Sequence, residues 1–121
     1  MNNGIGSIGE NSAAAYLLNK GYMILARNYR TKFGEIDIIT QDQSGMVVFI
    51  EVKTLLIKTD RKSNLMPEDN LSQWKLYKLR RICNFFANKY SALIWENGWR
   101  IDLIAIVIRN QKGRVKHYQN I

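Results

Sequence analysis

The sequence predicts an α/β fold in which a mixed β-sheet of four to five strands is flanked by helices, in the order αβββαβ(β). Two segments have the periodicity and end signals of helices, and segments rich in β-branched and aromatic residues lie between and after them. One of these, WRIDLIAIVIR at residues 99–109, is apolar on both faces, which is typical of an interior strand. The length suits a single domain over residues 1–121.

The stretch SIGENSAAAYLLNKG predicts a first helix over about residues 8–20. Ser7 and Glu10 have the spacing of a capping box, in which each side chain accepts from the other residue's backbone N–H. Gly21 stands where a glycine often ends a helix, because glycine adopts the left-handed conformation needed there without strain.

Three strands are expected next. Residues 22–30, YMILARNYR, are β-prone and predict the first strand. The segments GEIDIIT at 34–40 and MVVFIEVKT at 46–54 are separated only by the turn sequence QDQSG. The second and third strands are therefore expected to form a hairpin.

The second half of the chain predicts a loop, a helix and one or two strands. Residues 55–69 are polar and predict a loop, after which Asn70 and Gln73 are candidate caps of the helix LSQWKLYKLRRICNFFANKY. The strand at 99–109 follows, and a short last strand is expected at 114–119. One side of the helix is expected to face the core, through Leu76, Leu79, Ile82, Cys83 and Phe86.

The composition favours a basic protein of the reducing cytoplasm. Eighteen Lys and Arg against ten Asp and Glu give a net charge of +8, which suggests a polyanion partner such as nucleic acid, although solubility alone is an alternative. One cysteine excludes an intrachain disulfide and a cysteine-rich zinc site. The N-terminus lacks the pattern of a signal peptide, and no apolar run is long enough for a bilayer, so no membrane partner is expected.

The segment FIEVKT places charge at the end of an apolar strand. Glu51 and Lys53 share one face of the strand, and the predicted hairpin brings the face of Glu35 and Asp37 alongside. Clustered carboxylates repel, and a divalent cation such as Mg²⁺ or Mn²⁺, which prefers hard oxygen ligands, would relieve that repulsion. With a lysine beside it, such a site is suited to metal-assisted hydrolysis of a phosphodiester. The alternative is a structural ion pair of Lys53 with Glu51 or Asp37.

An acidic residue in one strand followed by Glu-x-Lys at the end of the next resembles the PD-(D/E)xK nuclease superfamily, which has a restriction-endonuclease-like fold. The closer resemblance is to the YraN-like family of uncharacterised bacterial proteins, predicted endonucleases related to archaeal Holliday-junction resolvases. It extends over about residues 4–108. The segments that carry it are GSIGENSAAAYLLNKGYMILARNYR, GEIDIIT, VVFIEVKT, WKLYKLRR and RIDLIAI.

The resemblance implies a role for each matching residue. Asp37 and Glu51 would bind the metal, and Lys53 would be the catalytic lysine, so that all three form the catalytic set. Glu10 occupies the position of a glutamate that the superfamily often places on the first helix near the metal; a capping role with Ser7 is the alternative, and both can hold at once. A homodimer is implied by analogy with the resolvases.

Further basic residues are candidates for contacts with DNA. Lys75, Lys78 and Arg81 recur on one side of the second predicted helix, where the alternative is a solvated helix face. Arg27 and Arg30 lie on the first predicted strand. They would contact DNA or form an ion pair with Glu35.

Four aromatic residues and two polar residues are given mainly structural roles. Tyr29, Trp74, Trp95 and Trp99 are expected to pack in the core or at a sheet edge rather than to stack on bases. Asp102 is expected to be bonded to a buried arginine or to backbone, whereas His117 is expected at the surface.

The function expected from the sequence is therefore that of an endodeoxyribonuclease dependent on Mg²⁺ or Mn²⁺, with branched or structured DNA as one candidate substrate. The alternative is a module with the same fold that binds nucleic acid without cleaving it.

Overall fold

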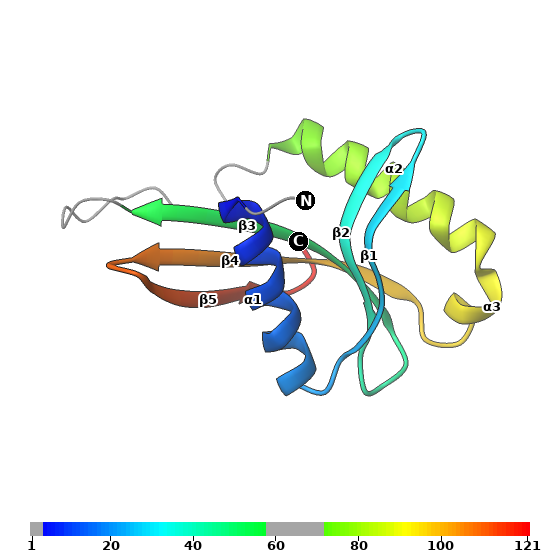
Figure 1. Cartoon of the computed structure of the whole chain (residues 1–121). Helices are drawn as coiled ribbons and strands as arrows, with labels where there is room; N and C mark the ends of the chain where they lie inside the picture. Colours follow the sequence, from blue (N-terminus) through cyan, green and yellow to red (C-terminus); the bar gives the residue numbers. More distant parts are fainter. Residues whose placement is uncertain (1–3, 58–71) are drawn as a thin grey trace.

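The computed structural model describes residues 4–57 and 72–121 (Figure 1). A single sheet of five strands, in the order β1-β2-β3-β4-β5, carries helices on both faces. The elements are α1 (Ile5–Asn19), β1 (Met23–Thr31), β2 (Gly34–Gln41), β3 (Val47–Ile57), α2 (Gln73–Lys89), α3 (Ser91–Ile94), β4 (Trp99–Arg109) and β5 (Lys112–Tyr118). The predicted fold class and element order are confirmed, with the short α3 as an addition.

The sheet is mixed because β3 and β4 run parallel while every other neighbouring pair is antiparallel. Strand β4 lies between β3 and β5, as its two apolar faces predict. Alternate residues of β3 point to opposite faces: Phe49 packs in the cluster on the α2 side, whereas Val48 and Ile50 pack in the cluster on the α1 side. The two helices thus bury opposite faces of one sheet.

Helix α1 begins earlier than predicted, and the capping box is wrong. The backbone carbonyl of Gly4 accepts from the N–H groups of Ser7 and Ile8 at 3.1 and 3.2 Å, so Ser7 lies inside the first turn and cannot cap it. The predicted end is confirmed. Gly21 has φ +87°, and the bonds Gly21 N–H to Leu18 and Tyr22 N–H to Leu17 close the helix as a Schellman motif.

Helix α2 is capped by Ser72, whose hydroxyl accepts from Lys75 N–H at 3.1 Å. Gln73 is instead the first helical residue, and Asn70 lies outside the described residues. The predicted core side is confirmed, since Leu79, Ile82, Cys83 and Phe86 are buried and Leu76 packs beside them. Among the described residues, no helix is both long and apolar enough to cross a lipid bilayer.

Strand β3 is longer than predicted. Residues 55–57, expected to open a loop, pair in parallel with Val107, Ile108 and Arg109 of β4, so the strand continues to Ile57. The rest of the predicted loop, residues 58–69, lies outside the described residues.

A network of buried polar side chains joins β4 to β5 and α1. Asp102 is fully buried and accepts from Arg100 Nε at 2.9 Å and from the backbone N–H of Asn120 at 2.9 Å, as predicted. The side chain of His117 is only 8% exposed, so its predicted surface position is wrong. Its ring bridges Asp102 Oδ2, at 2.7 Å, and the hydroxyl of Tyr16, at 3.0 Å. These contacts join residues far apart in the chain.

Candidate metal and phosphodiester site

The candidate site lies where β2 and β3 separate. Their antiparallel pairing ends at the pair Ile38 and Ile50, whereas β3 continues beside β4. Figure 1 shows the β1–β2 hairpin turning away from the rest of the sheet at one end. Beyond the last pair, the backbone N–H of Val52 donates to Asp37 Oδ2 at 2.8 Å. The Asp37 side chain thus supplies an acceptor to β3 where backbone pairing with β2 has ended.

Helix α1 approaches this opening closely because Gly9 has no side chain. A Cβ atom at Gly9 would collide with the side chain of Thr54 on β3. The absence of a side chain lets the helix lie against the strand, and the next residue, Glu10, then reaches the end of β2. In α1, Gly9 therefore permits the close contact with β3, and Glu10 directs a carboxylate at the site.

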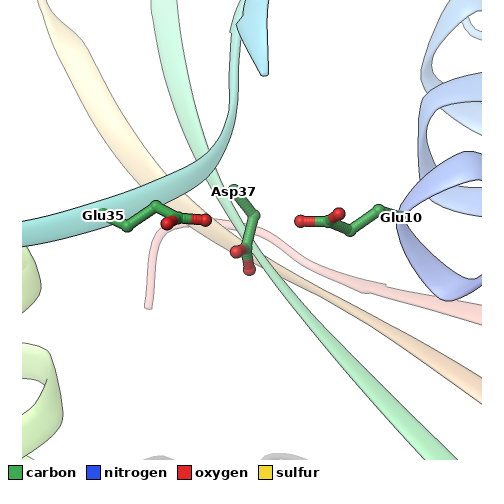
Figure 2. A group of neighbouring side chains, drawn as sticks. All are labelled: Glu10, Glu35 and Asp37. Carbon is green, nitrogen blue, oxygen red and sulfur yellow. The ribbon is translucent and has the colours of Figure 1, made fainter. Parts of the chain in front are cut away.

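Three carboxylates meet at the opening. One oxygen each of Glu10, Glu35 and Asp37 lies within 4.8 Å of the others, and Figure 2 shows these side chains converging from α1 and β2. The amide nitrogen of Asn28, in the orientation that satisfies its neighbours, donates to Glu10 Oε1 at 3.0 Å and to Glu35 Oε1 at 3.1 Å. Arg30 Nε pairs with Glu35 Oε2 at 3.1 Å, as the sequence suggested.

Glu51 on β3 interacts with this group through its charge. Burial raises the pKa of Glu51 to about 8, and repulsion by Asp37 adds to the effect. The ammonium groups of Lys53 and Lys75 oppose it by favouring the ionised carboxylate. Glu51 follows Phe49 by two residues, so strand alternation places it on the α2 side of the sheet. Burial raises the pKa of the Cys83 thiol on that side, and the charge of Glu51 adds to the rise.

The pKa of Asp37 is raised by burial and by like charges, as that of Glu51 is. Burial raises the pKa of Asp37 to about 6, against the hydrogen bond from Val52, and the neighbouring charges of Glu10 and Glu35 raise it further. Fewer carboxyl groups are ionised in such a cluster than would be ionised if they were far apart, because each negative charge opposes the next ionisation. A cation among them would remove that penalty.

The donor set fits a hard divalent cation. Carboxylate oxygens are the ligands that Mg²⁺ and Mn²⁺ prefer, and three separate side chains offer one within a small volume. The structure brings together the sequence-predicted Glu10 and Asp37 and couples Glu51 to them, but Glu51 is not part of the compact group of three. Glu35 takes that place.

Glu35 was placed in the carboxylate cluster from the sequence but was not named as a metal ligand, and Asn28 was not recognised at all. Glu35 carried a usable signal, since it shares a strand face with Asp37 in GEID. Asn28 carried none, because its role depends on the left-handed backbone at φ 52° and on the position of a helix distant in the chain. Both are contributed by the hairpin that separates from β3.

The basic residues predicted to contact DNA have different environments. Lys75, Lys78 and Arg81 are all exposed on α2, and Lys75 is close enough to Glu51 to lower its pKa. Arg27 donates to Asn11 Oδ1 at 2.8 Å, and Arg30 is engaged by Glu35. Lys75 therefore acts on a carboxylate of the site, whereas Lys78 and Arg81 form no ion pair with a carboxylate among the described residues.

The aromatic residues divide into two pairs. Tyr29 and Trp99 pack against the core cluster on the α2 side, as expected. Trp74 and Trp95 are 62% and 85% exposed, so the expectation that they pack in the core or at a sheet edge is wrong. The α2 position of Trp74 explains the difference, because the buried side of that helix begins two residues later, at Leu76.

The fold has a relative among solved structures. A repair endonuclease from Pyrococcus abyssi matches with a TM-score of 0.50 and 11% sequence identity, covering 92% of this chain. The chain spans 42% of the length of that endonuclease, so the likeness concerns one part of it. At this identity the match shows the fold alone, and it confirms the endonuclease-like architecture predicted from the sequence.

Sequence comparison identifies closer relatives. A UPF0102 protein of Alkaliphilus oremlandii is 39% identical, with 99% of this chain and 98% of the relative covered. A UPF0102 protein of Desulforamulus reducens is 36% identical, with 97% and 91% covered. Residues 9–106 match the family described as "Uncharacterised protein family UPF0102". The resemblance to YraN-like proteins is thus confirmed, and the chain belongs to the family UPF0102.

Proposed function

We propose that this protein is a nuclease dependent on Mg²⁺ or Mn²⁺ that hydrolyses phosphodiester bonds of DNA. The observation that carries the proposal is the group of carboxylates from Glu10, Glu35 and Asp37 at the opening of the sheet, together with Glu51 and Lys53 in the middle of β3. The endonuclease-like fold supports it, and so does the net charge of +8.

Asp37, Glu51 and Glu10 would hold the cation, with Glu35 as a fourth carboxylate near it. When bound, the cation would polarise a phosphoryl group and lower the pKa of a water molecule. The hydrogen bond from Val52 fixes one oxygen of Asp37, so this carboxylate is oriented before any ligand arrives. Asn28 in turn links Glu10 to Glu35, which brings α1 and β2 to the same centre.

Lys53 would stabilise the negative charge that develops on the phosphate oxygens during attack by water. Its ammonium lies close enough to Glu51 to oppose the rise in that residue's pKa, so it already acts on the site. Lys75 acts on the same carboxylate from α2, and would contact the phosphate next to the one cleaved. Both lysines place positive charge where a polyanion would enter.

A module that binds nucleic acid without cleaving it is the second candidate function. The basic surface supports that function equally, but four carboxylates at the opening do not, because their negative charge repels phosphate unless a cation is bound. The catalytic proposal accounts for both the basic surface and the clustered carboxylates. The homodimer implied by the resemblance has no support among these findings and stays a prediction.

The test is a cleavage assay with labelled four-way junction, flap, single-stranded and duplex DNA, in Mn²⁺, Mg²⁺ or EDTA. Wild type is expected to cleave at least one of these substrates with metal and none in EDTA. Lys53→Met is expected to lower the rate about 100-fold or more, since it removes a group that stabilises charge in the transition state. Lys112→Met, which removes an exposed lysine from β5, is the matched control and should retain the wild-type rate.

Equal cleavage by wild type and Lys53→Met would contradict the role given to this lysine. Binding of DNA with no cleavage in either metal would support the non-catalytic module.

A further inference from the structure

One side of α2 exposes both aromatic rings and cations. The residues lie about one turn apart along the helix, so they form a continuous band, which is extended by a phenylalanine from the β1–β2 turn. This band, called the α2 stripe below, consists of Trp74, Tyr77, Lys78, Arg81, Phe85 and Phe33.

The rings of the α2 stripe contact one another and the cations. Trp74 and Tyr77 are stacked, with ring centroids 5.7 Å apart and an interplanar angle of 14°. Lys78 Nζ lies 5.2 Å from the centroid of the Trp74 ring, and the Arg81 guanidinium lies 4.7 Å from that of Phe33. Each cation thus lies over a ring, with its charge still available to a ligand.

These rings remain exposed to water although the core is well packed. Trp74 and Tyr77 are 62% and 55% exposed, and both are large apolar groups whose exposure is unfavourable. Their mutual stacking orders them without burying them. Exposed rings that are already held in a common orientation form a ready platform for another flat ring.

The charge of α2 identifies the kind of partner. The helix QWKLYKLRRICNFFANK contains five Lys and Arg and no Asp or Glu, so its exposed side attracts a polyanion. A DNA duplex offers phosphates, but its bases are stacked inside and are not accessible to the rings. An unpaired strand offers both phosphates and free base faces, and it alone uses both parts of the α2 stripe.

We propose that the α2 stripe binds an unpaired stretch of nucleic acid, with bases stacked on Trp74 and Tyr77 and phosphates held by Lys78 and Arg81. The link to the site is Lys75, which follows Trp74 in the chain and acts on Glu51. A strand on the stripe would therefore lead to the carboxylates. The relevance to cleavage rests on the proposed function, whereas the binding itself does not require metal.

The test compares two labelled ligands of equal charge by fluorescence anisotropy in EDTA: a thymidine oligonucleotide of about 12 nucleotides and a strand of abasic nucleotides of the same length. Wild type is expected to bind the thymidine strand about tenfold more tightly, which is within the effect of stacking one base. Trp74→Ala should reduce this preference sharply, because it removes one of the two stacking rings and leaves the other without its partner. Trp95→Ala removes an exposed tryptophan that follows α3, and should keep it.

Lys78→Ala provides a second test. It should weaken binding of both ligands equally, because it removes a phosphate contact and leaves the rings in place. It should also reduce the salt dependence of the affinity by about one charge. Equal affinity of wild type for the two ligands would overturn the proposal, as would a preserved preference in Trp74→Ala. Absence of binding to either strand would also overturn it and would point to a protein partner instead.

The two proposals fail separately. Asp37→Asn should abolish metal-dependent cleavage but keep the preference for bases measured in EDTA. A wild-type protein that prefers the thymidine strand yet never cleaves would contradict the proposed function only. A protein that cleaves but binds both strands equally would contradict only the role of the α2 stripe.

Discussion

The sheet carries two buried groups of charged side chains that differ in how their charges are balanced. Burial alone would raise the pKa of Asp102, but hydrogen bonds from His117, Arg100 and the Asn120 backbone hold it below its ordinary value. At the opening between β2 and β3, burial and like charges raise the pKa of Asp37 to about 6 and that of Glu51 to about 8. In one group an arginine and a histidine pair with the aspartate, and the other consists mainly of carboxylates.

The difference separates a structural network from a candidate ligand site. Around Asp102, each acceptor meets a donor within the protein, so the network holds β4, β5 and α1 together. Around Asp37, the protein supplies a backbone N–H and an asparagine amide, and among the described residues Arg30 pairs with Glu35 while Lys53 and Lys75 act on Glu51. Excess negative charge at one point is expected where a cation binds.

The largest contrast should appear when each aspartate is replaced by asparagine. Asp102→Asn leaves Arg100 and His117 without their buried anion, and should lower the free energy of unfolding by about 3–5 kcal/mol. Asp37→Asn removes repulsion while its side-chain oxygen still accepts from Val52, and should leave stability unchanged or raise it. Urea denaturation in EDTA at pH 8 measures both.

A large loss of stability in Asp37→Asn would contradict this contrast. It would mean that Asp37 belongs to a structural ion pair with Lys53, the alternative considered for FIEVKT.

The pH dependence of stability should distinguish the two groups next. Because the folded pKa values of Asp37 and Glu51 are raised, the folded state binds protons more tightly, and stability falls as the pH rises from about 4.5 to 8. The expected loss in the metal-free protein is several kcal/mol, because each unit of pKa shift corresponds to about 1.4 kcal/mol. Asp102 has a lowered pKa, so its contribution is lost only in more acidic solution.

Urea denaturation at several pH values checks this expectation. Glu51→Gln should flatten the fall between pH 6 and 8, whereas Glu96→Gln, at an exposed position outside both groups, should keep the wild-type profile. A wild-type protein whose stability rises over that range would show that the carboxylates are not repelling one another.

The smallest of these effects should come from Asn28. Asn28→Gly removes the donor shared by Glu10 and Glu35, while glycine tolerates φ 52° without strain. Loss of a group that orients ligands is expected to weaken Mn²⁺ binding about tenfold, with little change in the melting temperature in EDTA. Calorimetric titration measures the affinity.

Asn110→Gly is the matched control, because Asn110 also has a positive φ, 51°, but lies between β4 and β5. Equal Mn²⁺ affinity in wild type and Asn28→Gly would mean that the asparagine does not orient the carboxylates.

The same contrast shows what the sequence could predict. The strands and the core side of α2 follow from periodicity, which is local, and the pairing of Asp37 with the Glu51 strand follows from the short turn between them. The helix starts were less certain because several nearby residues compete to cap each one. Gly4 begins α1 and Ser72 begins α2, each close to a plausible alternative.

Features that depend on distant parts of the chain were not predictable. His117 is buried because its ring meets Tyr16, which is 101 residues away. Tryptophan is usually a well-buried residue, yet Trp74 lies just before the first buried turn of α2 and is exposed. Asn28 joins the site only because α1 lies against β3 through Gly9. Tertiary contacts decide these cases, and no local pattern encodes them.

The central claim is that the carboxylates at the opening of the sheet bind a divalent cation that serves phosphodiester hydrolysis. Calorimetric titration of Mn²⁺ and Mg²⁺ into wild type, Glu51→Ala and the control Glu96→Ala, followed by incubation of the same samples with labelled DNA, tests it most directly. We predict metal binding and cleavage in wild type and the control, and the loss of both in Glu51→Ala. A wild-type protein that binds neither metal, or a Glu51→Ala variant that binds and cleaves as well as wild type, would contradict it.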